Sequence, residues 1–213
     1  MTRTILITGS SIGIGRFAAY EFAKNGDTAI ITYRTHKKEA EETAEKCKQL
    51  GGKASTMQLD VMKDESIDKA LESVKKKYKE IDVLVNNAGY ADRGHLIDEE
   101  DKETEQMLRT NVEGLIKLTK RFLPITKEII INVASDAGKI GIANLSTYCA
   151  SKFAVRGFTF ALAKEVEQKV YCVNPGITST RMTNYLGEPP QNVAKKIFKA
   201  AQGKQPSGSE FDM

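Results

Sequence analysis

The sequence predicts an α/β protein: a doubly wound parallel sheet with helices on both faces, in a single domain that spans residues 1–213. Short apolar runs alternate with helical patterns along the chain, as in parallel sheets whose strands are joined by crossover helices. Several of these runs are apolar almost without interruption, which is typical of strands buried on both faces of a sheet. No internal repeat, low-complexity tract or linker divides the chain.

This alternation gives the following elements in chain order. The expected strands are 4–8, 28–33, 54–59, 82–86, 128–133 and 170–173. The expected helices are 14–24, 37–50, 64–79, about 103–123 and about 147–168. Gly26 and Gly51 follow the first two helices, where glycine commonly ends a helix. The tail 202–213 contains glycine and proline and has room for one short last strand.

The composition is that of a globular protein, with 40% hydrophobic and 28% charged residues. The net charge of +4 and the isoelectric point near 8.8 are only mildly basic, and no basic stripe with interleaved aromatics occurs. We therefore expect no nucleic-acid partner. No apolar stretch approaches the roughly 20 residues of a membrane span, so we expect no membrane partner either.

The three cysteines are widely separated and form no C-x-x-C pair, which argues against a disulfide framework and a zinc site. The two histidines stand alone, so no metal site is expected. Because the chain enters its first strand at once, without a signal-peptide pattern, we expect a cytoplasmic protein.

The stretch "TGSSIGIG", residues 8–15, lies between the first strand and the first helix. Its glycines are spaced G-x-x-x-G-x-G, whereas the dinucleotide fingerprint is G-x-G-x-x-G. Glycines here let the backbone approach a phosphate, and the helix N-terminus offers free N–H groups; the alternative is a turn that binds nothing. No Gly-Lys-Ser/Thr ends the segment, which excludes a Walker loop. The candidate phosphate- or ribose-binding residues are Gly9, Ser10, Ser11, Gly13, Ile14 and Gly15.

Three further motifs follow in the chain: "NNAG" at 86–89, "YCASK" at 148–152 and "NPGITST" at 174–180. With the glycine loop, and in this order, they resemble the short-chain dehydrogenase/reductase family across nearly the whole chain. The resemblance implies a Rossmann-type fold and an NAD(P)-dependent oxidoreductase.

Tyr148 and Lys152 are four residues apart, so in a helix they share one face. A tyrosine pKa of about 10 is too high for acid–base work near neutral pH, and a lysine ammonium about 4 Å away would lower it by up to about 3 units. The alternative is a surface pair on an amphipathic helix. Ser135, at the end of a strand, can hydrogen-bond a substrate carbonyl or merely cap a turn.

The resemblance assigns these residues their roles. Tyr148 gives its proton to the carbonyl oxygen, Ser135 positions that oxygen, and Lys152 lowers the pKa of the tyrosine and binds the nicotinamide ribose. Asn111 is the fourth catalytic member and holds a water that links Lys152 to solvent. The cofactor delivers a hydride to the carbonyl carbon.

The second strand ends in "ITYRTHKK", where NAD-dependent enzymes usually place an acidic residue for the ribose hydroxyls. Tyr33 stands there, and Arg34 follows, whose guanidinium can bind a 2′-phosphate with two hydrogen bonds. The alternative is a basic turn that opens a helix. We therefore expect NADP(H) to be preferred, with NAD(H) possible.

The remaining cofactor residues come from the resemblance alone. Asp60 and Val61 are expected at the adenine, and Asn86 is expected to brace the sheet. The backbone of Asn87, Ala88 and Gly89 is expected to pass the cofactor. The loop that lines the nicotinamide and its phosphate side contains Pro175, Gly176, Ile177 and Thr180.

The region of about 177–203 is short for this family, so the substrate pocket is expected to be open and the substrate stays undetermined. A ketone, an aldehyde, a 3-oxoacyl thioester (as in 3-oxoacyl-acyl-carrier-protein reductases), a quinone-like or a sugar carbonyl all remain. The helices about 103–123 and about 147–168 are apolar on more than one side, so a homodimer or homotetramer is expected.

Two other functions compete with a carbonyl reductase. A non-catalytic NAD(P)-binding sensor would be expected to lose the serine, tyrosine or lysine, and all three are present. A sugar-nucleotide epimerase or dehydratase of the same superfamily usually needs a larger substrate domain.

Overall fold

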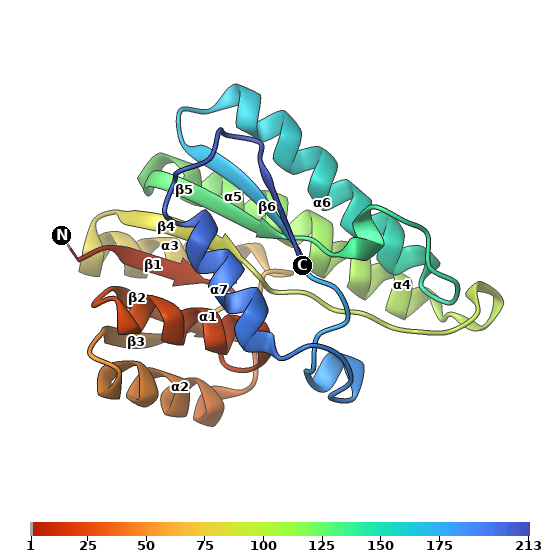
Figure 1. The fold of residues 1–213 in the computed structure, drawn as a ribbon, viewed down its shortest axis with the longest axis horizontal. Coiled ribbons are helices and arrows are strands. Elements are labelled where there is room, and N and C mark those ends of the chain that lie inside the picture. The colour runs from red at the N-terminus through yellow and green to blue at the C-terminus, as the bar shows by residue number, and fades with distance from the viewer. Residues whose placement is uncertain (1) are drawn as a thin grey trace.

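The computed structural model describes residues 2–213 and contains one seven-stranded, fully parallel sheet in the order β3-β2-β1-β4-β5-β6-β7 (Figure 1). This confirms the predicted fold class. The strands are β1 Thr4–Ile7, β2 Thr28–Tyr33, β3 Lys53–Gln58, β4 Ile81–Asn86, β5 Thr126–Val133, β6 Lys169–Asn174 and β7 Glu210–Asp212. The short β7 occupies the tail in which the sequence left room for a strand.

The inner strands bury both of their faces, since successive side chains point to opposite sides of the sheet, whereas the edge strand β3 is only partly buried. Ile5 and Ile7 of β1 belong to one core, which α1, α2 and α7 cover, while Leu6 belongs to the other, which α3, α5 and α6 cover. The helices are α1 Gly13–Lys24, α2 Lys37–Gln49, α3 Asp64–Tyr78, α4 Asp101–Leu108, α5 Leu115–Phe122, α6 Ser146–Glu165 and α7 Pro190–Ala200.

The expected helix of about 103–123 is divided in the structure. Residues Arg109–Gly114 between α4 and α5 form a π-helical segment, which contains the buried Asn111. Gly114 packs so closely that a Cβ atom there would lie 2.6 Å from the carbonyl oxygen of Val61. A uniform helical pattern in the sequence does not reveal this widened turn, because π-turns arise from such tertiary contacts.

Helix α7 is absent from the elements that the sequence predicted. It starts within the pair Pro189–Pro190, which reads as a loop although proline is well tolerated in the first turn of a helix. Its buried Val193, Ala194 and Ile197 lie on one face and pack into the same core as α1. The segment that we expected to be merely shortened therefore completes one face of the sheet.

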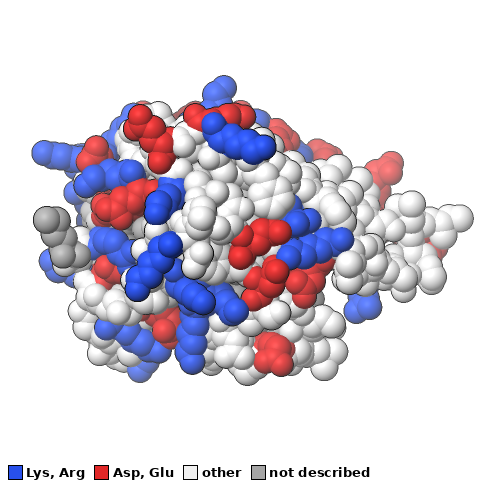
Figure 2. All heavy atoms as spheres, turned by 45° about the horizontal axis from the view of Figure 1, so that its top comes forward, with Lys and Arg blue, Asp and Glu red and all other residues white. Residues whose placement is uncertain are grey.

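The strand order reverses between β1 and β4, so the loops that follow these two strands diverge to opposite faces and leave a crevice at their carboxyl ends. No helix among residues 2–213 has both the length and the apolar character needed to cross a membrane. On the face drawn in Figure 2, basic and acidic side chains are interspersed, and the part that projects to the right carries few charges.

Candidate active site

The glycine loop joins β1 to α1 at this crevice. Gly13 has a φ of +58°, which favours glycine, and it begins α1 without a side-chain cap and without an acidic residue in the first turn. Gly15 is packed so tightly that a Cβ atom would lie 2.6 Å from the side-chain nitrogen of Asn87. The helix N-terminus is thus exposed to the crevice with its N–H groups available for an anion.

Ser10 does not have the role that we expected of it. Its side chain is fully buried, its hydroxyl donates to the carbonyl oxygen of Ile7 at 2.8 Å, and it accepts from the N–H of Thr32 at 2.9 Å. The hydroxyl therefore joins the ends of β1 and β2 and has no hydrogen left for a phosphate. Ser11, in contrast, borders the crevice.

The crevice is a cavity of about 600 Å³. It is bordered by the ends of β1, β2, β3 and β4 and by the segment after β6. The predicted cofactor residues along it are Gly9, Ser11, Gly13, Ile14, Arg34, Asp60, Val61, Asn87, Ala88, Gly89 and Thr180. The predicted residues that do not line it are Ser10, Gly15, Asn111, Ser135, Tyr148, Lys152, Pro175, Gly176 and Ile177.

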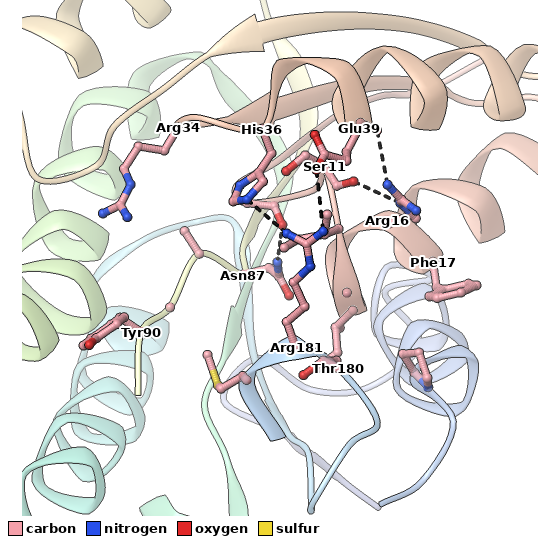
Figure 3. A pocket seen from close by; sticks show the side chains of 18 of the residues that line it. Ser11, Arg16, Phe17, Arg34, His36, Glu39, Asn87, Tyr90, Thr180 and Arg181 are labelled. Carbon is pink, nitrogen blue, oxygen red and sulfur yellow. Dashed lines mark hydrogen bonds and ion pairs between the residues drawn. The ribbon is translucent and has the colours of Figure 1, made fainter. Parts of the chain in front are cut away.

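Several charged residues line this cavity that the sequence analysis did not single out. Arg16 donates to the carbonyl oxygen of Ser11 at 2.9 Å, and Arg181 lies 3.1 Å from His36 and 3.6 Å from a carboxylate oxygen of Glu39 (Figure 3). The sequence does contain a hint of both arginines, because Arg16 directly follows Gly15 and Arg181 directly follows Thr180, and these two residues belong to the motifs.

The serine, tyrosine and lysine meet next to Gly89, at the end of the cavity. A Cβ atom on Gly89, which lines the cavity, would lie 3.7 Å from Nζ of Lys152, so the ammonium group lies just behind this part of the cavity wall. That Nζ lies 5.6 Å from the ring centroid of Tyr148. Ser135 follows β5, where its hydroxyl donates to the carbonyl oxygen of Pro175 at 3.3 Å.

The expected lowering of the pKa of Tyr148 by Lys152 is not found. Burial raises the pKa of Tyr148 to about 12, and the neighbouring Ser135 side chain acts weakly in the opposite direction. Burial also lowers the pKa of Lys152 to about 8, because its Nζ is enclosed. Nζ donates to the carbonyl oxygen of Val133 at 3.0 Å. Both effects have one cause, because a low-dielectric site favours the neutral form of each group.

Asn111 is almost fully buried, and both hydrogens of its amide are used. Nδ2 donates to the carbonyl oxygen of Tyr90 at 2.8 Å and to Oγ of Ser151 at 3.0 Å, while Oδ1 accepts from the N–H of Tyr90 at 2.7 Å. The side chain therefore fixes the segment after Gly89 to α6. A water linked to Lys152 would therefore have to donate to the second lone pair of Oδ1 or bind the backbone of this residue.

Among the other predicted residues, Asn86 and Asp60 form hydrogen bonds within the protein, whereas Ile177 is largely exposed. Asn86 Nδ2 donates to Asn132 and to Thr119, each at 2.8 Å, which joins β4 to β5 and α5. Asp60 accepts from the N–H of Met62 at 3.1 Å. Ile177 is 68% exposed.

Strand β7 is connected to the turn at Ser135 through Arg156, one turn beyond Lys152 on α6. The Arg156 guanidinium binds the Glu210 carboxylate with two hydrogen bonds of 2.8 and 2.9 Å, and it donates to the carbonyl oxygen of Gly138 at 2.8 Å. Gly138 lies in the turn that begins at Ser135. This half-buried ion pair thus connects β7, α6 and the serine turn.

We expect Glu210→Gln to lower the free energy of unfolding by about 1–2 kcal/mol at neutral pH. The hydrogen bond from Arg156 lowers the pKa of Glu210 below its ordinary 4.5, so the stabilisation is complete above 4.5 and is lost as the pH falls through the lowered value. Urea unfolding at neutral and acidic pH measures this, with the exposed Glu128→Gln as control. A difference that persists in acid would contradict the ion-pair explanation.

The residues present fit a dinucleotide. The uncapped N-terminus of α1 suits a pyrophosphate, the cavity reaches Gly89 close to Lys152, and Arg34 lines the cavity at the end of β2. The Arg34 side chain makes no hydrogen bond or ion pair with any other residue in the range 2–213.

Comparison with known proteins agrees with this geometry. Residues 3–191 match the family model described as short chain dehydrogenase, so the chain belongs to that family. This confirms the resemblance that the motifs indicate.

Individual relatives are similar over most of the chain. The chain is 35% identical to mouse estradiol 17-beta-dehydrogenase 11, with 91% of this chain and 67% of that protein covered. It is 35% identical to human 17-beta-hydroxysteroid dehydrogenase 13, with 84% and 63% covered. It therefore spans about two thirds of the length of these relatives.

The crystal structure of a dehydrogenase/reductase from Sinorhizobium meliloti 1021 superposes with a TM-score of 0.93 at 25% identity, covering 100% of this chain and 94% of that one. The whole chain, including α7 and β7, thus has its equivalent in a solved structure.

Proposed function

We propose that this protein reduces a carbonyl compound to an alcohol with NADPH. The observation that carries the proposal is the meeting of Ser135, Tyr148 and Lys152 behind Gly89, at the end of the cavity. When bound, the dinucleotide supplies the hydride, which is chemistry that no side chain provides.

The chain's own residues supply position and a proton. With a pKa raised to about 12, the Tyr148 phenol stays protonated at neutral pH. The positive charge of Lys152, together with that of an oxidised nicotinamide ring, would have to lower this pKa for efficient donation to a carbonyl oxygen. The Ser135 hydroxyl orients that oxygen, and Lys152 stabilises the phenolate that proton transfer leaves behind. Family membership supports oxidoreduction, and the identity of the substrate is part of this proposal.

The preference for NADPH rests on Arg34. We expect Arg34→Asp to weaken NADPH binding by about tenfold or more, because it replaces a cation by an anion where the 2′-phosphate would lie. NADH binding should be unchanged or improved, since a carboxylate can accept from the ribose hydroxyls. Fluorescence titration of both cofactors measures this. Lys38→Asp, an equal charge change on an exposed residue outside the cavity, is the control.

An apolar substrate is favoured by the segment between β4 and α4. Leu96 and Ile97 there are 64% and 92% exposed, as is Ile140 at 60%. The N–H of Gly94 donates to the carbonyl oxygen of Asn144, which holds this segment against the loop that leads to Tyr148. The names of the relatives add hydroxysteroids to the candidates, and the corresponding ketosteroids would be the substrates of a reduction.

A substrate screen that follows NADPH absorbance tests the proposal, with ketosteroids, 3-oxoacyl thioesters, aldehydes and simple ketones side by side. Turnover that requires Tyr148 would support a reductase. Tight NADPH binding without turnover of any of these would favour a non-catalytic sensor.

We also propose that the protein forms a homodimer or homotetramer through α4, α5 and α6. Leu108, Ile116 and Phe153 on these helices are 41%, 36% and 45% exposed, which supports a covered surface. Sedimentation measures the oligomeric state.

A further inference from the structure

One wall of the cavity is a segment, residues 177–188, that folds onto itself between β6 and α7. The N–H of Ser179 donates to the carbonyl oxygen of Glu188, and the N–H of Glu188 donates to that of Ile177, each at 2.8 Å. Thr180 and Thr183 form a reciprocal capping pair. The segment therefore holds its own shape and presents the next residue, Arg181, toward the cavity.

Arg181 crosses the cavity to the opposite wall. Its guanidinium lies 3.1 Å from Nε2 of His36 and 3.6 Å from Oε1 of Glu39, at the start of α2 (Figure 3). The Arg181 side chain is 55% exposed. Its ion pair with the Glu39 carboxylate consists of one long contact and is not bidentate. Such a contact in partial water is weak.

The same wall carries the anion site of the proposed function. Arg34 is two residues before His36, lines the same cavity and has no partner of its own in the range 2–213. Arg16 also lines it, and its guanidinium is held by the carbonyl oxygens of Ser11 and Glu39. A doubly charged phosphate near Arg34 would offer Arg181 a stronger acceptor than the Glu39 carboxylate, since an arginine–phosphate pair can form two parallel hydrogen bonds.

We propose that Arg181 is the second cation for the 2′-phosphate of NADPH and that Glu39 occupies it until the phosphate arrives. This inference rests on the proposed NADPH dependence and extends it to a residue on the opposite wall. The exchange would tie the 177–188 segment across the bound cofactor. NADH lacks the phosphate and would leave Arg181 paired with Glu39. Only NADPH would therefore hold the 177–188 segment over the bound cofactor.

Binding measurements test the inference without a substrate. Arg181→Gln is expected to raise the Kd of NADPH about tenfold and that of NADH less than about twofold. Arg181→Lys should recover part of the lost NADPH affinity, because lysine keeps the positive charge but lacks the bidentate guanidinium. Lys195→Gln, an exposed residue of α7 outside the cavity, controls for net charge.

Glu39→Gln is expected to change the Kd of NADPH in the opposite direction. Removing the competing carboxylate should lower the Kd of NADPH about threefold or more and leave that of NADH nearly unchanged. A variant that only disturbed folding would weaken both cofactors.

Limited trypsin digestion provides a second readout, since Arg181 is itself a cleavage site. At saturation of each cofactor, NADPH should protect the Arg181–Met182 bond more than NADH does. Equal loss of both cofactors in Arg181→Gln, or equal protection by both, would overturn the inference and leave the oxidoreductase proposal intact. If neither cofactor binds the unaltered protein, the proposed function itself fails.

Discussion

Tyr148→Phe is expected to reduce carbonyl turnover by a factor of about 10³ or more while NADPH binds within about twofold of its normal Kd. The phenol lies at the end of the cavity, beyond the residues that line it, and the change removes one oxygen from a half-buried ring. The loss should therefore fall on the chemical step rather than on cofactor affinity.

The measurement is the rate of NADPH oxidation with the best substrate of the screen, together with cofactor titration and thermal unfolding. Tyr20→Phe, a half-buried tyrosine of α1 outside the cavity, is the matched control and should keep its turnover. Near-normal turnover by Tyr148→Phe would eliminate this tyrosine as the proton donor.

Lys152→Met is expected to change how stability depends on pH. The pKa of Lys152 is lowered from 10.5 to about 8 in the folded protein, so between these values the unfolded chain binds a proton that the folded chain does not. The contribution of Lys152 to the free energy of unfolding therefore increases as the pH rises from 8 to 10.5, by about 3 kcal/mol in total. The methionine variant lacks this gain.

Urea unfolding of both proteins from below pH 8 to above pH 10.5 measures the difference, in which groups common to both proteins cancel. Lys164→Met, an exposed lysine near the end of the same helix, should parallel the unaltered protein. A constant difference between Lys152→Met and the unaltered protein across this range would show that the amine is not buried in its neutral form.

The sequence predicts the sheet and most of its helices because the inner strands are short apolar runs and the first two helices are followed by glycines. It does not predict α7, since a helix that opens on two prolines has the local signature of a loop. It also does not reveal the π-helical turn at Asn111, which depends on contact between Gly114 and Val61 from another part of the chain.

The candidate site also has features that the sequence predicts and features that it does not. Spacing within one helix predicts that Tyr148 and Lys152 share a face, and the motifs mark the loops around the cavity. Burial overturns the electrostatic expectation for this pair, because sequence spacing says nothing of the dielectric around it. Arg181 and Glu39 are far apart in the chain, so only the folded structure brings them together.

The bond between Arg156 and Glu210 has a consequence for biosynthesis. The serine turn and the lysine helix are made well before β7, yet both are held by a carboxylate that lies 54 residues beyond Arg156 in the chain. The central strands β1, β2 and β4 have all their partners once β5 is complete. A nascent chain is therefore expected to form its nucleotide-binding half first and to become competent for catalysis only after Glu210 has left the ribosome.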